Sequence, residues 1–190
     1  MLDDLLAAID DANAADPALV HHDGADVARS LLQGRRATHW LHRLADEPPP
    51  AVQLAVRAHH LRRFERPRGD YPDGRAGYLR WRRDARTAHA AALADLLARC
   101  GAEPALVDRA AALVRREGLG TDPEAQLVED AACLVFCETD LDALLARLGP
   151  ERTADALVKT AKKMSATALA LVQHATPPGP ARALLTEVLG

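Results

Sequence analysis

The chain has 190 residues, a net charge of −3, 48% hydrophobic residues and only 3% aromatic residues. This length suits one domain, or one domain with an appendage, and is enough to bury a core without help from a metal ion or a disulfide. The shortage of aromatic residues argues against a β-sandwich and favours closely packed helices of Ala, Leu and Val. The negative net charge makes nucleic acid an unfavourable partner for the chain as a whole.

The number of cysteines and the hydropathy of the chain indicate the cellular compartment in which the protein is expected. Cys100, Cys133 and Cys137 are odd in number and lie in apolar, helix-like surroundings, which is typical of small buried hydrophobes rather than of a metal site. The acidic, amphipathic start does not look like a signal peptide, and no run approaches the roughly 18 apolar residues of a membrane span. We therefore expect a cytoplasmic protein with no membrane partner. The sequence does not fix an oligomeric state.

Apolar periodicity, capping residues and breakers predict helices along the whole chain. The loop from Asn13 to Gly24 is expected to be irregular, and its His22–Asp23 doublet is interpreted as a solvated turn. The expected helix ranges are 2–12, 26–44, 50–63, 76–99, 104–116, 123–138, 140–148, 150–163, 165–174 and 181–189. The expected N-caps are Asp26, Asp122, Asp140 and Ser165.

No segment alternates convincingly between apolar and polar residues, so no strand is expected. The predicted fold is a single all-α domain over residues 1–176, with a last helix, 177–190, appended after the Pro- and Gly-rich hinge TPPGP.

One segment, residues 62–86, concentrates positive charge. Its nine arginines and four acids give +5, which leaves −8 for the rest of the chain. Guanidinium groups beside aromatic rings are suited to binding an anion or a planar polar ligand. The expected ligand-binding residues are Arg62, Arg66, Arg68, Tyr71, Tyr78, Trp81, Arg82 and, from a later segment, Lys162. Lys163 beside it is expected to add positive charge to the same pocket. The alternative is a solvated salt-bridge network without a ligand.

Histidines and acids follow one another in a suggestive order: His60 in the third helix, His89 in the fourth, and Glu129–Asp130 in the middle of an apolar helix. This order is similar to that of metal-dependent phosphohydrolases with the HD fold, in which imidazole and carboxylate ligands hold a divalent ion. The resemblance implies an HD-like core of about five helices with further helices at both ends, and these four residues as catalytic candidates.

The sequence departs from the HD pattern at two places. Leu61 follows His60 where the namesake aspartate is expected, and Arg36 stands where a first ligand histidine is expected. A two-metal site is therefore not expected. One hypothesis is a single divalent ion held by His60, His89 and Asp130. The other is a direct hydrogen bond between His60 and Asp130, because a buried charge needs a partner.

Most of residues 9–165 also resemble the family named domain of unknown function 4202. The segments that carry this resemblance are IDDANAADP, QLAVRAHHLRRFERPRGDYPDGRAGYLRWR, the histidine of RTAH, EDAACLVFCE and KTAKKMS. The family brings no established activity with it.

Three functions follow as hypotheses. The first is a small-molecule hydrolase or phosphohydrolase acting on an anionic, nucleotide-like substrate. The second is a metal-free module that binds a small anionic ligand through the arginines and aromatic rings. The third, weakened by the net negative charge, is RNA binding through the basic segment.

Overall fold

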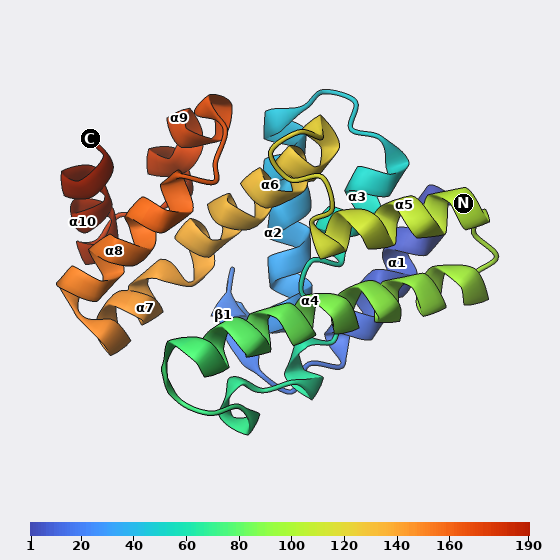
Figure 1. The fold of residues 1–190 in the computed structure, drawn as a ribbon, viewed down its shortest axis with the longest axis horizontal. Helices are drawn as coiled ribbons and strands as arrows, with labels where there is room; N and C mark the ends of the chain where they lie inside the picture. Colours follow the sequence, from blue (N-terminus) through green and yellow to red (C-terminus); the bar gives the residue numbers. More distant parts are fainter.

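Helices make up nearly all of the regular structure in the computed structural model, which describes residues 1–190 (Figure 1). The prediction of an all-α domain is confirmed. The ten α-helices are α1 (Leu2–Ala14), α2 (Arg29–Leu44), α3 (Pro50–Arg57), α4 (Gly74–Arg99), α5 (Pro104–Arg115), α6 (Pro123–Thr139), α7 (Leu141–Leu148), α8 (Pro150–Ala161), α9 (Ala166–Ala175) and α10 (Pro180–Leu189). None of them has the length and apolarity that crossing a membrane requires.

The core is built from small and aliphatic side chains, as the composition predicts. One continuous cluster draws fully buried leucines and isoleucine from most helices, among them Ile9, Leu41, Leu54, Leu93, Leu113, Leu134 and Leu185. Helix α6 runs through the middle of the molecule and packs against α2, α3, α5, α7 and α9 (Figure 1). Polar side chains on α6 are therefore enclosed from several directions.

The C-terminal helices α7 to α10 gather at the opposite end of the molecule from the N-terminus (Figure 1). Helix α10 packs against α7, α8 and α9, and its Ala181 and Leu185 are fully buried in the same core cluster as the preceding helices. The division of the chain at residue 177 stays a prediction.

A short β-hairpin replaces part of the loop expected before α2. Strand β1 (Leu19–His22) pairs antiparallel with β2 (Ala25–Ala28). Asp23 and Gly24 form the turn with φ angles of 49° and 81°. Asp-Gly is a favoured pair for such a turn because both residues tolerate positive φ. The prediction of no strand was therefore wrong here, where two strands of four residues are too short to show alternation.

The predicted caps have mixed outcomes. Asp122 and Ser165 accept hydrogen bonds from N–H groups in the first turns of α6 and α9, at 2.9 Å and 3.2 Å. Asp26 is not a cap, because it lies in β2 and pairs with His21 at 3.1 Å. Asp140 precedes α7 but makes no capping bond, since its carboxylate turns towards α2.

Helix α3 ends at Arg57, six residues earlier than the sequence predicts. From Ala58 the chain continues in turns, and Arg62 adopts a left-handed conformation with φ of 53°. His59 contributes to this, because its Nδ1 lies 2.9 Å from the Val56 carbonyl oxygen and binds the end of the helix. The two adjacent histidines therefore lie on a turn below α3 rather than on a helix.

The segment between α3 and α4 is pinned to the start of α4. It contains two 3₁₀ turns, Arg63–Glu65 and Arg68–Asp70. A Cβ atom at Gly77 would lie 1.8 Å from the carbonyl oxygen of Pro72, so only glycine allows this approach. The basic segment is thereby held against the helix that carries the rest of its arginines.

Candidate functional site

Glu129 is a fully buried acid in the middle of α6, with a side chain that is 0% exposed. Lys163 Nζ donates to its Oε1 at 2.9 Å, and the Arg116 guanidinium forms an ion pair with its Oε2. Burial is the largest single influence and opposes ionisation, but Arg116 and Lys163 outweigh it and lower the pKa of Glu129. The carboxylate is therefore charged at neutral pH.

Three further cations form no salt bridge. Arg82 and Arg86 are close enough to Glu129 for their charges to interact, and Arg63 donates to His60. Arg63, Arg82 and Arg86 are half-buried and form no salt bridge. The guanidinium of Arg63 lies 5.0 Å from the Trp81 ring, and that of Arg82 lies 5.8 Å from the Tyr78 ring. Burial lowers the pKa of Arg63 and of Arg86. We call Arg63, Arg82, Arg86, Arg116 and Lys163 the cationic cluster.

The members of the cationic cluster are close enough for their charges to interact. Arg116 and Arg82 both contribute to lowering the pKa of Arg86, while Glu129 opposes them. Arg82 also contributes to lowering the pKa of Arg63, but the carboxylate that opposes this lowering is Asp140, which acts on Arg63 more strongly than Arg82 does. Five cations against one carboxylate give a net surplus of four positive charges, and Arg63, Arg82 and Arg86 have no salt-bridge partner. The nearby pair of Arg29 and Asp140 adds no net charge.

Three histidines border the cationic cluster. The ring centroids of His59 and His60 are 4.1 Å apart, and those of His60 and His89 are 6.2 Å apart. Burial lowers the pKa of His59 and of His89 to about 4, and it holds the pKa of His60 well below its usual range. Arg63 and Arg116 further lower the pKa of His60. All three imidazoles are therefore neutral at pH 7.

Hydrogen bonds identify the tautomer of two of these imidazoles. Nδ1 of His59 lies 2.9 Å from the Val56 carbonyl oxygen, and Nδ1 of His89 lies 2.7 Å from the Leu61 carbonyl oxygen. A carbonyl oxygen only accepts, so the hydrogen of each neutral ring is on Nδ1. Nε2 of each ring is therefore an unprotonated acceptor. Nε2 of His59 is buried and has no hydrogen-bond partner.

His60 differs from its neighbours because both of its nitrogens are engaged. Its Nε2 accepts from Arg63 Nη1 at 2.8 Å, and its Nδ1 donates to Gln33 Oε1 at 2.9 Å. Gln33 in turn donates to Asp140 at 2.8 Å. His60 thus holds the Arg63 guanidinium in place and connects it to α2.

Asp130 does not meet His60, so the direct bond that the sequence suggested is not formed. Its Oδ1 accepts from the backbone N–H of Ser165 and from Gln126 Nε2, both at 2.9 Å. Gln126 also donates to the Lys163 carbonyl oxygen at 2.8 Å. Asp130 therefore fastens the 163–165 turn to α6, and that turn supplies Lys163 to the cationic cluster.

The expected metal ligands do not fit a divalent ion. No group of three or more His, Cys, Asp and Glu side chains is placed to hold one. His60 has no free nitrogen, and Asp130 faces the 163–165 turn. The surplus positive charge of the cationic cluster also repels a cation. The structure thus brings His60, His89 and Glu129 into one region but leaves Asp130 outside it.

The other sequence-predicted residues are divided between several places. Arg82 belongs to the cationic cluster, and the buried Trp81 lies against Arg63 and donates to the Arg66 carbonyl oxygen at 2.9 Å. Tyr78 is 43% exposed beside Arg82. Lys162 is exposed, whereas the adjacent lysine reaches Glu129.

The remaining predicted arginines engage their own segment. Arg62 pairs with the exposed Glu65, and Arg68 donates to the carbonyl oxygens of Tyr71 and Pro72 at 2.8 Å and 2.9 Å. Arg66 is exposed and has no acid partner. These contacts stabilise the segment before α4 rather than extend the cationic cluster.

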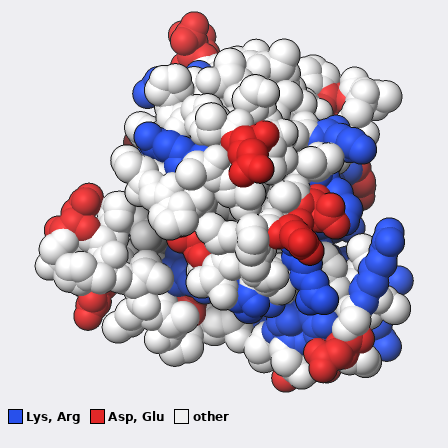
Figure 2. Space-filling model, turned by 90° about the vertical axis from the view of Figure 1, so that its left-hand side faces the viewer, with Lys and Arg blue, Asp and Glu red and all other residues white.

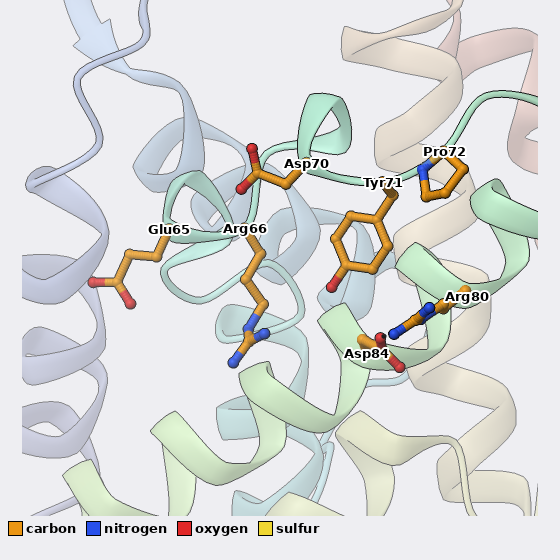
Figure 3. Close-up of a pocket in the computed structure, with 7 residues that line it drawn as sticks. All are labelled: Glu65, Arg66, Asp70, Tyr71, Pro72, Arg80 and Asp84. Carbon is orange, nitrogen blue, oxygen red and sulfur yellow. Dashed lines mark ion pairs between the residues drawn. The ribbon is translucent and has the colours of Figure 1, made fainter.

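Arg66 and Tyr71 line a separate open pocket of about 440 Å³ (Figure 3). Figure 3 shows the Tyr71 ring directed towards Arg80 and Asp84 on α4, and the Glu65 side chain turned away from them. The full lining is Glu65, Arg66, Asp70, Tyr71, Pro72, Arg80 and Asp84. Three acids against two arginines do not make an anion site.

Basic side chains also gather low on one face of the molecule, at the height of the segment before α4 and the start of that helix (Figures 1 and 2). Acids lie among them (Figure 2). Arg80 and Arg83 at this end of α4 both pair with Asp84. This surface offers less uncompensated charge than the half-buried cationic cluster.

Sequence reasoning missed four members of the site. Arg86 lies four residues after Arg82, a spacing that places both on one face of α4 and that could have identified it. No local sequence pattern indicated that Arg116 belongs to the site, since it ends α5 in a left-handed conformation with φ of 66°. The missed residues are His59, Arg63, Arg86 and Arg116.

Comparison with known proteins agrees with the sequence segments noted above. No curated protein matches the chain, and no solved structure matches it either. The model of one family, described as a domain of unknown function (DUF4202), matches residues 3–185. This match spans almost the entire chain, from the first helix to the last. The protein therefore belongs to the domain of unknown function 4202 family.

Proposed function

We propose that this protein binds a small phosphate- or carboxylate-bearing anion at the cationic cluster, without a divalent metal ion. The observation that carries this proposal is the net surplus of four positive charges in the cationic cluster, on side chains that are partly withdrawn from water. A charge withdrawn from water is costly unless it is paired. An anion with two or more negative charges supplies that pairing.

The kinds of cation in the cluster also favour an oxyanion. Four of the five are arginines, whose planar forks match the oxygen spacing of phosphate and carboxylate groups. Arg63 and Arg82 are further oriented by aromatic rings, and His60 holds Arg63 from the other side. Guanidinium groups that are already oriented lose less conformational freedom when a ligand binds.

Metal-independent hydrolysis of the bound anion is a second candidate function. The observation that favours it is the pair of unprotonated Nε2 atoms on His59 and His89, since such a nitrogen accepts a proton from an attacking water. A pKa of about 4 makes each imidazole a weak base at neutral pH, so binding remains the first proposal.

Calorimetric titration with inorganic pyrophosphate in the presence of a chelator tests the proposal. We expect binding at low ionic strength, and we expect Arg86→Gln and Arg63→Gln each to weaken it about tenfold or more, since each removes one unpaired charge. Chelation should leave the affinity unchanged, because no metal ion takes part.

Arg83→Gln is the matched control. Arg83 lies on the same helix as Arg86 but is 70% exposed and already pairs with Asp84. It should therefore change the affinity less than about threefold. An absence of pyrophosphate binding, or equal losses for Arg83→Gln and Arg86→Gln, would contradict the proposed site.

A further inference from the structure

We infer, on the basis of the proposed anion site, that its ligand presents an O–H or N–H donor beside its negative charge, and that Nε2 of His59 accepts from this donor. The ligand class is then a protonated oxyanion, such as hydrogen phosphate or a phosphate ester with a neighbouring hydroxyl group. An oxyanion without hydrogens, such as sulfate, lacks this donor.

The cationic cluster by itself cannot make this distinction. Its guanidinium and ammonium groups only donate hydrogen bonds, so they serve every oxyanion of the same charge and shape equally. A preference for a protonated oxyanion requires a group in the site that only accepts. Carboxylates and unprotonated imidazole nitrogens are the side-chain groups that do so at neutral pH.

Nε2 of His59 meets this requirement. The bond from its Nδ1 to the Val56 carbonyl oxygen leaves Nε2 without a hydrogen, and Nε2 is buried with no donor opposite it. Arg63 and Arg116 of the cationic cluster, and Glu129, are the charged groups that act on the His59 ring. Buried polar atoms without a partner are uncommon in proteins and often mark a place where a ligand or water binds.

The neighbouring groups leave this role to His59. Nε2 of His60 already accepts from Arg63, and the Glu129 oxygens face Lys163 and Arg116. An aprotic anion beside His59 would therefore place its lone pairs against the lone pair of Nε2. A protonated oxyanion turns this repulsion into a hydrogen bond.

A ligand reaches this nitrogen when the half-buried cationic side chains shift. Long arginine and lysine side chains have many rotamers with which to do so. Nε2 of His89 is a second acceptor of the same kind, held by its Nδ1 bond to Leu61. The site thus combines surplus donors with imidazole acceptors, which matches an oxyanion that still carries a hydrogen.

The test compares sodium hydrogen phosphate with sodium sulfate in calorimetric titrations at about pH 8 and constant ionic strength, where both anions carry a double negative charge and only phosphate keeps an O–H. Wild-type protein should prefer phosphate about tenfold, as expected for one buried hydrogen bond to an otherwise unpaired acceptor. His59→Leu should reduce this preference to less than about twofold while still binding sulfate. His39→Leu, the same change at an exposed position, should keep the preference.

The imidazole ¹⁵N resonances of the wild-type protein provide a readout that needs no variant. Hydrogen phosphate should shift the Nε2 resonance of His59, and sulfate should leave it in place. Equal affinity for the two anions, or a preference that His59→Leu retains, would overturn this inference and leave the anion site standing. A protein that binds neither of these anions nor pyrophosphate would overturn both.

Discussion

Adjacent residues in this protein have opposite roles. Within the pair Glu129–Asp130, the first lies among cations and the second fastens a turn. Of Lys162 and Lys163, only the second reaches the site, and of His59 and His60, only the first leaves a nitrogen free. On helix α6, neighbouring side chains point about 100° apart, so Glu129 faces the site and Asp130 does not. The other two pairs lie on turns, where each residue has its own orientation.

Glu129 offers a test at this scale. We expect Glu129→Gln to lower the free energy of unfolding by about 3 kcal/mol, because it leaves the half-buried Arg116 and Lys163 without their counter-charge. Urea unfolding followed by circular dichroism measures the loss. Glu117→Gln is the control, since Glu117 is 59% exposed in its pair with Arg115 and should cost less than about 1 kcal/mol. Similar losses for both variants would mean that Glu129 is not a buried counter-ion.

At the scale of elements, α6 and α4 assemble the site. Helix α6 contributes Glu129 and, through Asp130, anchors the turn that carries Lys163. Helix α4 contributes Arg82, Arg86 and His89. The turn after α3 supplies the other two histidines and Arg63 between these helices. The site therefore depends on how the segment after α3 is held against α4.

Gly77 tests that dependence. Gly77→Ala should lower the free energy of unfolding by about 2 kcal/mol, because the new methyl group collides with the backbone at Pro72, which cannot rotate away. Gly69→Ala lies in the same segment, where a Cβ meets nothing within 4 Å, and should change stability by less than about 0.5 kcal/mol. Thermal unfolding of the two variants side by side distinguishes them. A stable Gly77→Ala protein would show that the segment packs loosely on α4.

For the whole molecule, the question is whether the last helix shares one cooperative unit with the others. Leu185 of α10 is fully buried in the common core cluster, together with leucines from α1 to α8. If α10 were only an appended helix, its loss would leave the remaining core intact.

Leu185→Ala should therefore lower the midpoint of global unfolding and cost about 3 kcal/mol, the usual effect of a cavity in a packed core. Val158→Ala on α8 is the control, because Val158 is 39% exposed and its truncation leaves no cavity. Hydrogen exchange at α6 reports on the core independently of α10. Local fraying of α10 with unchanged protection of α6 would instead support a separate appendage.

The sequence by itself determined the all-α class, nearly every helix range, the caps Asp122 and Ser165, and the family. These follow from local causes: apolar periodicity, a capping oxygen and a proline act within a few residues of one another. It also indicated that His60, His89, Glu129 and Arg82 belong to one region. It did not predict the early end of α3, where His59 binds the Val56 carbonyl oxygen and His89, 28 residues further along the chain, binds the Leu61 carbonyl oxygen.

Only the tertiary structure decided which polar side chains meet. Glu129 accepts a hydrogen bond from Lys163, which is 34 residues away in sequence, and His60 is hydrogen-bonded to Gln33, which is 27 residues away. Such pairings depend on the packing of helices that are distant in sequence, and the helical pattern of each segment is the same whichever partner it meets. For this reason the sequence named Asp130 as a site residue and did not distinguish Lys162 from Lys163. Packing brought Lys163 and Arg116 to Glu129 and left His59 with an unpaired nitrogen beside them.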